Sequence, residues 1–215
     1  MKVLLAGATG LVGGHLLDYL LSNDEITQIH AIGRRDIRIE NHKFVSHVVD
    51  FDKLSGDESY FNVDTVFCCL GTTIKKAGSK QAFKKVDLEY PLKLARLTQN
   101  AGASCFSIIT AIGSDPDSRF FYNRVKGNVE YELKNMKFER LHIHRPAGIM
   151  GERKENRPGE SFFNGLLGAL SFVLFGPLRK IRPVEAKMIA KVMLDKTLDP
   201  EKGLRIVSST EYQKP

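Results

Sequence analysis

The stretch Gly7-Ala8-Thr9-Gly10-Leu11-Val12-Gly13 decides the fold of this 215-residue chain. An apolar run at 2–8 predicts a β-strand before it, and helical spacing of apolar side chains predicts a helix over Leu11–Ser22. Glycines between a strand and a helix permit a tight turn, and they let a ligand approach the backbone closely. The first N–H groups of such a helix favour a phosphate. The stretch therefore predicts a Rossmann turn that holds a dinucleotide. The residues expected to contact it are Gly7, Thr9, Gly10, Leu11, Val12 and Gly13.

Strand-like and helix-like segments alternate along the rest of the chain. The expected strands are 29–33, 43–49, 63–70, 104–109, 140–144 and 204–207, and the expected helices are 80–85, Tyr90–Asn100, 118–136 and 184–198. Near-continuous apolar strands separated by helices are typical of a parallel sheet that is covered on both faces. We therefore expect an α/β fold, with a doubly wound Rossmann-type parallel sheet and helices on both faces. One domain should span 1–215, with about 146–200 forming a small C-terminal substrate-side region.

Composition narrows the class of protein. The chain is 42% hydrophobic and 27% charged, which is typical of a soluble globular protein. The longest apolar stretch, 166–175, is about ten residues, whereas a spanning helix needs about 20, so we expect no transmembrane segment. Nothing at the N-terminus resembles a secretory signal. Three cysteines, two of them adjacent (Cys68 and Cys69), argue against a disulfide framework and for a reducing compartment. We therefore expect a cytoplasmic protein, and no Cys/His spacing suggests a metal site.

The formal net charge of +7 allows two interpretations. One is a basic solvated surface, and the other is a ligand rich in phosphate. Nucleic-acid binding would require a basic stripe with interleaved aromatic residues or a known reader motif. The sequence contains neither, so no nucleic-acid partner is expected.

The end of the second expected strand indicates which dinucleotide binds. A site that prefers NAD places an acidic residue there for the ribose 2′-hydroxyl, but this sequence has Gly33-Arg34-Arg35. A guanidinium can bind a 2′-phosphate through two hydrogen bonds, whereas a carboxylate would repel it. Asp36 follows one position too late for the ribose. The sequence therefore predicts NADP(H), bound through Arg34 and Arg35.

Two further strand ends are candidate cofactor contacts. Asp50 and Phe51, after the third strand, could contact the edge of an adenine ring, through a carboxylate hydrogen bond and an apolar contact. Leu70, Gly71 and Thr72 follow the fourth strand, where Gly71 would let the backbone pass close to the cofactor.

A tyrosine and a lysine four residues apart suggest proton transfer. Tyr122 and Lys126 lie on one side of the expected helix 118–136. A nearby ammonium stabilises a phenolate and lowers the pKa of the phenol. Tyr122 could then exchange a proton with a substrate oxygen while hydride is transferred, and Lys126 could also hold the nicotinamide ribose. A hydroxyl after the fifth strand should orient the substrate oxygen, with Thr110 favoured over Ser114.

These motifs together resemble the atypical short-chain dehydrogenases/reductases. The motifs are GATGLVG at 7–13, GRR at 33–35, LGTT at 70–73, YNRVKGNVE at 122–130 and HRPAGIMGERKENRPGE at 144–160. More narrowly, they are similar to the small Tat-interacting-protein-like oxidoreductases and their bacterial relatives, from residue 3 to about 192. The resemblance implies NADPH binding through Gly7, Gly10, Gly13 and Arg34, and an active Tyr122/Lys126 pair. The family's catalytic serine corresponds here to Thr110, which keeps the hydroxyl and adds a methyl group.

The region after the sixth expected strand should face the substrate. Arg145 could contact the cofactor side, pair with a substrate carboxylate, or brace its own loop. The loop 151–160 has mixed charges, with Pro158-Gly159 as a candidate hinge for closure. The apolar segment 162–175 could cap the cleft, line an apolar substrate pocket, form a subunit contact, or rest on a membrane surface.

The sequence thus favours an NADPH-dependent oxidoreductase that acts on a small-molecule carbonyl or alcohol, as a monomer or homodimer. A non-catalytic NADP(H)-sensing regulatory protein with a protein partner is the alternative, motivated by Thr110 and by regulatory relatives. A third interpretation is an epimerase or dehydratase that retains its cofactor, although such enzymes usually carry a longer C-terminal substrate domain.

Overall fold

Seven parallel strands form the central sheet of the computed structural model, which describes residues 1–151 and 182–213. The strands are β1 (Lys2–Ala6), β2 (Gln28–Gly33), β3 (Phe44–Val48), β4 (Thr65–Cys68), β5 (Cys105–Ile109), β6 (Arg140–Arg145) and β9 (Gly203–Ser208). Their order across the sheet is β3-β2-β1-β4-β5-β6-β9. The chain first winds outward from β1 to β3 and then crosses back to β4, which places the topological switch point between β1 and β4. This confirms the doubly wound α/β fold.

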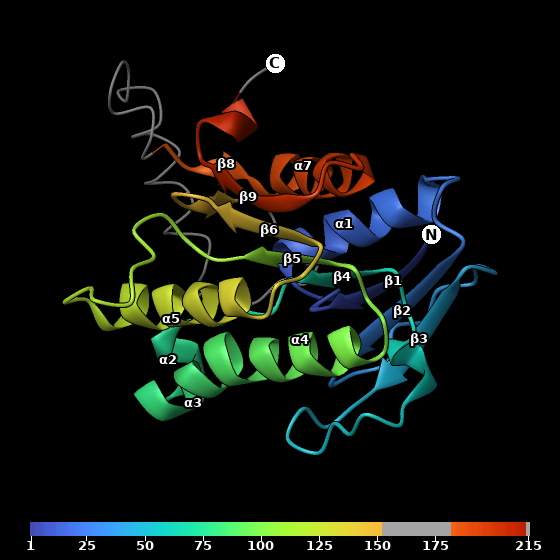
Figure 1. Cartoon of the computed structure of the whole chain (residues 1–215), viewed down its shortest axis with the longest axis horizontal. Helices are drawn as coiled ribbons and strands as arrows, with labels where there is room; N and C mark the ends of the chain where they lie inside the picture. The colour runs from blue at the N-terminus through green and yellow to red at the C-terminus, as the bar shows by residue number, and fades with distance from the viewer. Residues whose placement is uncertain (152–181, 214–215) are drawn as a thin grey trace.

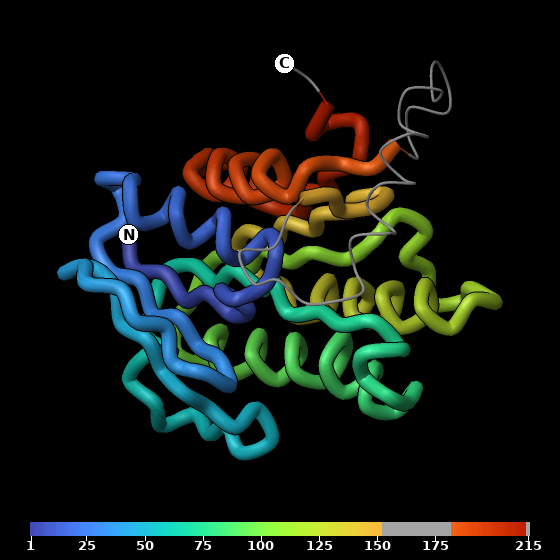
Figure 2. Tube along the Cα trace, turned by 180° about the vertical axis from the view of Figure 1, so that it is seen from behind, coloured from blue at the N-terminus to red at the C-terminus, as the bar shows by residue number. Residues whose placement is uncertain are grey.

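Helices cover both faces of the sheet (Figure 1). The helices α1 (Leu11–Ser22) and α7 (Ala186–Leu198) pack on one face, and α4 (Tyr90–Asn100) and α5 (Phe121–Asn135) pack on the other. Figure 2 shows the same layers from behind. The strand β1 is buried on both faces, which explains why its residues are apolar without interruption rather than alternately apolar and polar. Val3 and Leu5 belong to the apolar core under α1, whereas Leu4 belongs to the core under α4, and all three are fully buried.

The second helical layer contains a feature that the periodicity did not indicate. A short helix, α2 (Ile74–Ala77), is followed by α3 (Lys80–Lys84), the π-helical segment η2 (Lys85–Glu89) and then α4 without interruption. The sequence predicted two separate helices here. They are instead one rod whose middle is π-helical, because the backbone stays right-handed helical at Lys85 and Tyr90.

Other boundaries shift for local reasons. The helix α5 begins at Phe121, not at 118, because Phe120 is extended and the Arg124 guanidinium donates to the Ser118 carbonyl oxygen (2.6 Å). The expected helix 184–198 begins only at Ala186. Its first two residues form β8 (Val184–Glu185), which pairs with β7 (Ile149–Met150) in a separate two-stranded sheet. Short 3₁₀ turns, η1 (Ser59–Phe61) and η4 (Glu211–Gln213), complete the described elements.

Two sequence predictions lie outside the described residues. They are the hinge at 158–159, with most of the mixed-charge loop around it, and the apolar segment 162–175. Within residues 1–151 and 182–213, no helix is long and apolar enough to cross a membrane.

Candidate cofactor and catalytic site

The glycine turn between β1 and α1 is packed so closely that it admits no side chains. Gly7 has a positive φ of 90°, and a Cβ placed on it would lie 2.6 Å from the Cys69 carbonyl oxygen. A Cβ on Gly13 would lie 2.2 Å from the Gly7 carbonyl oxygen. Among the described residues, no side chain caps α1 at Gly10, so its first N–H groups can bind an anion. The turn therefore fits a pyrophosphate.

A cavity of about 630 Å³ opens over this turn at the switch point. Most of the predicted cofactor residues line it: Gly7, Thr9, Gly10, Leu11, Arg34, Arg35, Asp50, Phe51, Leu70, Gly71 and Thr72. Val12, Gly13, Lys126 and Arg145 do not line it. Val12 and Gly13 are buried, since they pack the helix against the strand rather than face the cavity.

Sequence reasoning missed part of the cavity wall. The missed residues include His15, Asp18, Ile37, Ile39, Lys76, Val86 and Tyr90. His15 and Asp18 lie one and two turns into α1, where helical spacing after the glycine turn could have indicated them. The others come from segments that reach the cavity only through the tertiary fold.

One end of the cavity carries the two arginines. Arg34 and Arg35 follow β2 directly, and both are exposed where they border the cavity. Asp36 does not line the cavity, and its carboxylate pairs with Arg38 (3.8 Å). The cavity does contain two carboxylates, Asp18 and Asp50, but neither occupies the position that directly follows β2.

Side-chain contacts hold the loop after β3 against η2 and α4. Phe51 stacks on Tyr90, with ring centroids 5.2 Å apart, and both residues line the cavity. The Tyr90 hydroxyl donates to Asp52 Oδ1 (3.0 Å), and Lys85 pairs with Asp52 Oδ2 (2.7 Å). The hydrogen bond from Lys85 holds the pKa of Asp52 below its usual range. These contacts hold a flat apolar wall in a fixed position, which suits an adenine ring.

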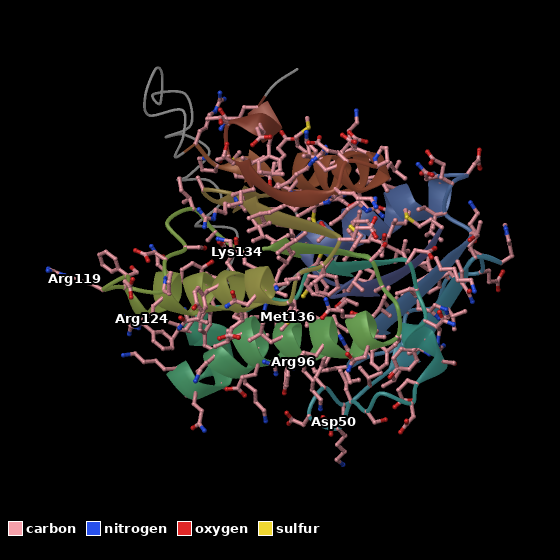
Figure 3. The ribbon with its side chains drawn as sticks, in the orientation of Figure 1. Asp50, Arg96, Arg119, Arg124, Lys134 and Met136 are labelled. Atoms are coloured by element: carbon pink, nitrogen blue, oxygen red, sulfur yellow. The ribbon has the colours of Figure 1, made fainter. Side chains whose placement is uncertain are left out.

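Tyr122 and Lys126 come from the start of α5, the end that Figure 3 marks with Arg119 and Arg124. Tyr122 is partly exposed and its ring packs on Phe83, with centroids 5.6 Å apart. Lys126 is buried. Burial alone would lower the pKa of Lys126, but its surroundings, the Asp87 carboxylate first among them, outweigh burial and raise that pKa.

Lys126 is linked to the cavity wall through Asp87. Its ammonium pairs with Asp87 Oδ1 (2.7 Å), and Asp87 Oδ2 accepts the Thr72 backbone N–H (2.9 Å). Thr72 lines the cavity. Lys126 is thus linked to the cavity wall through an aspartate that sequence reasoning did not select, whereas Tyr122 does not line the cavity.

The remaining catalytic candidates are engaged within the protein. The Thr110 hydroxyl donates to Glu130 Oε1 (2.6 Å), and Arg145 Nε donates to the same oxygen (3.0 Å). Arg145 therefore braces the network that Glu130 forms with Thr110. The Ser114 hydroxyl donates to the Ala111 carbonyl oxygen in its own turn (2.7 Å). Neither hydroxyl lines the cavity. Glu130 was missed, although its spacing of i+8 from Tyr122 and i+4 from Lys126 could have indicated it.

A doubly wound parallel sheet with a glycine-cradled cavity at its switch point defines a Rossmann-type dinucleotide-binding protein. No family model matches the chain. Curated relatives do match. Among them, Protein HTATIP2 of Rattus norvegicus is 38% identical over 79% of this chain and 71% of its own length. The mitochondrial protein fmp52 of Emericella nidulans is 36% identical over 78% of this chain and 76% of its own length. The chain belongs to the atypical short-chain dehydrogenase/reductase family of NAD(P)-binding proteins that includes HTATIP2 and FMP52.

A solved structure shares the fold. MoeE5 in complex with UDP-glucose and NAD matches with a TM-score of 0.71 at 16% identity, over 99% of this chain and 79% of that chain. The curated relatives also correct one expectation. The sequence predicted a cytoplasmic protein, but the fungal relatives are named as mitochondrial proteins, which contradicts that location.

Proposed function

We propose that this protein is an NADP(H)-dependent oxidoreductase that interconverts a small carbonyl compound and its alcohol. One observation carries the proposal. Lys126 is a buried, ion-paired lysine one helical turn from Tyr122, and its partner Asp87 bonds the cavity wall at Thr72. A buried ammonium one helical turn from a partly exposed phenol is suited to proton transfer.

The preference for the phosphorylated dinucleotide rests on the end of β2. Arg34 and Arg35 present positive charge where a carboxylate would have to lie to hold a 2′-hydroxyl. Guanidinium groups bind phosphate through two parallel hydrogen bonds. The glycine turn would hold the pyrophosphate, and Phe51 would border the adenine.

Each group has its own role in the proposed reaction. When bound, the dinucleotide supplies or accepts the hydride. Tyr122 gives its proton to the carbonyl oxygen, or takes it back in the reverse direction. An ammonium has three N–H donors, so Lys126 keeps two beyond its Asp87 contact, for the phenolate and for ribose hydroxyls. Thr110 would have to release Glu130 before it could donate to a substrate. We therefore assign the proton transfer to Tyr122 alone.

Turnover tests this proposal. NADPH consumption would be followed by absorbance over a panel of aldehydes and ketones, with Tyr122→Phe and with Tyr131→Phe as the matched control. Tyr131 lies on the same helix and is exposed. We expect Tyr122→Phe to lower kcat about 10²–10⁴-fold and Tyr131→Phe to leave it unchanged. Equal turnover in wild type and Tyr122→Phe would contradict the assignment.

The engagement of Thr110 with Glu130 favours a second candidate, an NADP(H)-sensing regulatory protein without turnover. It predicts NADPH binding that is unchanged by Tyr122→Phe, and no NADPH consumption with any carbonyl of the panel.

A further inference from the structure

Two histidines contact each other across the strands β2 and β3, away from the catalytic candidates. His47 lies opposite Ile32 in the parallel register, and His30 comes two residues before Ile32, so the three side chains share one face of the sheet. His30 Nδ1 and His47 Nε2 are 2.9 Å apart, which is a hydrogen bond between two imidazole rings. The strand β3 is at the edge of the sheet (Figure 1). This side-chain contact therefore helps to hold the edge strand against β2.

The pair is packed among groups from three other parts of the chain. His47 stacks on the buried Tyr60 of η1, with ring centroids 4.5 Å apart. Burial lowers the pKa of His30, and the charges of His47 and of Lys2 on β1 lower it further. Burial also lowers the pKa of His47, although Glu58, just before η1, opposes this shift. Burial raises the pKa of Tyr60, so its phenol is neutral in acid. Both histidines are therefore kept neutral by their surroundings near physiological pH.

A hydrogen-bonded pair of imidazoles tolerates one added proton but not two. In the neutral pair one ring N–H donates and the facing nitrogen of the other ring accepts. A first proton can bind the donor ring on its nitrogen outside the contact, and the hydrogen bond survives. A second proton must bind the accepting nitrogen. Two N–H groups and two positive charges then face each other with no acceptor between them, so the contact has to open.

The two strands that this contact joins carry one end of the cavity. Arg34 and Arg35 directly follow β2, and Asp50 and Phe51 follow β3 within three residues. All four line the cavity, and Ile32 lines it as well. If β3 parts from β2, the two arginines move relative to the aromatic wall after β3. The arrangement that suits a phosphorylated dinucleotide is then lost.

We propose that the His30–His47 pair is an acid-sensitive switch: uptake of the second proton parts β3 from β2 and weakens dinucleotide binding in the cavity. The parted form binds more protons than the closed form, so it gains population as the pH falls below about 6.5. The effect on the dinucleotide rests on the proposed function, because it requires that the cavity bind NADP(H). The release of β3 does not depend on the proposed function.

Hydrogen exchange followed by mass spectrometry tests the release of β3 in the full chain without nucleotide. The segment 44–61, from β3 to η1, would be compared at about pH 7.5 and about pH 5.5 in wild type, His47→Gln and His42→Gln. Glutamine can form hydrogen bonds but takes up no proton in this range. His42 is the matched control, since it is an exposed histidine just before β3. At one pH, the histidines elsewhere in the chain affect all three proteins alike.

We expect the exchange rate of wild type, divided by that of His47→Gln, to rise about three- to tenfold between the higher and the lower pH. The same ratio for His42→Gln should rise equally, because its pair is intact. A ratio that does not change with pH would overturn the proposal. His30→Gln removes the other partner of the pair, and it provides the same comparison if His47→Gln does not fold.

Calorimetric titration with NADP⁺ at the two pH values tests the effect on the cavity; NADPH decomposes in acid. The 2′-phosphate takes up a proton near about pH 6, so affinity should fall in every protein. We expect wild type and His42→Gln to lose about threefold or more affinity beyond the loss in His47→Gln. Equal losses in all three would overturn the proposed control of binding. If wild type bound no NADP⁺ at the higher pH, the proposed function would fail, and the exchange experiment would still decide whether the pair releases β3.

Discussion

At the scale of single residues, the site is organised by two buried carboxylates on the helical layer below the sheet. Asp87 binds Lys126, and Glu130 binds Thr110 and Arg145. The sequence indicated Tyr122 and Lys126 because their spacing alone places them on one face of a helix. Asp87 could not be selected in the same way. Its position depends on a π turn that inserts between two expected helices, and the apolar periodicity around it contains no sign of that turn.

Glu130 gives a prediction about stability. Glu130→Ala removes the ion-pair partner of the Arg145 guanidinium, and it leaves the Thr110 hydroxyl with only the His144 carbonyl oxygen as acceptor (3.3 Å). We expect a loss of about 3 kcal/mol in the free energy of unfolding, measured by urea denaturation. Glu132→Ala is the matched control, since Glu132 is only half-buried on the same helix and should cost about 0.5 kcal/mol or less. Equal losses in the two variants would show that the network contributes nothing specific.

At the scale of elements, the β1–α1 turn was the easiest part to predict and remains the most constrained. Its glycines could be recognised because their packing role leaves no alternative residue. Most strands were located from apolar runs, since a strand buried on both faces needs apolar residues throughout. The β7–β8 pair was missed because each strand has two residues, too few for a pattern.

Adjacent glycines of α1 give a matched pair of variants. Gly13→Ala would place a methyl group 2.2 Å from the Gly7 carbonyl oxygen, so the turn or the helix must move. We expect a loss of about 2 kcal/mol or more. Gly14→Ala would meet its nearest neighbour, the Ala8 carbonyl oxygen, at 3.6 Å. It should be neutral or stabilise the helix by up to about 1 kcal/mol. Thermal unfolding compares the two, and a Gly13→Ala variant as stable as Gly14→Ala would contradict the packing described here.

At the scale of the whole molecule, the doubly wound order follows from alternation and short connections, and the sequence predicted it at the level of class. The sequence did not predict which surfaces would meet. The adenine wall combines Phe51 after β3 with Tyr90 of α4, and the frame around Glu130 combines α5 with the ends of β5 and β6. Such pairings depend on the sheet order, which no local pattern records.

Two buried histidines of β6 make global stability depend on pH. Burial lowers the pKa of His142 to about 4 and that of His144 to about 3. In the unfolded chain both take up a proton near pH 6.5, whereas the folded protein holds them neutral. The unfolded state therefore binds more protons below pH 6.5, and stability falls as the pH falls through this window.

The expected slope is about 1.4 kcal/mol per pH unit for each histidine between pH 6.5 and about 5. Denaturant titrations of wild type and His142→Phe at several pH values measure this slope. The slope for the variant should be lower by about 1.4 kcal/mol per pH unit, the contribution of one histidine. If the two slopes were the same, His142 would not be held neutral by burial.

The most direct test of the central claim is calorimetric titration of the full chain with NADPH and with NADH. The proteins compared are wild type, Arg34→Ala, and Arg38→Ala as the control, because Arg38 is an exposed arginine of the same loop that does not line the cavity. We predict that wild type and Arg38→Ala bind NADPH about tenfold or more tightly than NADH, and that Arg34→Ala loses most of this preference. Equal affinity for the two nucleotides in wild type would contradict the role of Arg34. If neither nucleotide bound, the cavity at the switch point would not be a dinucleotide site.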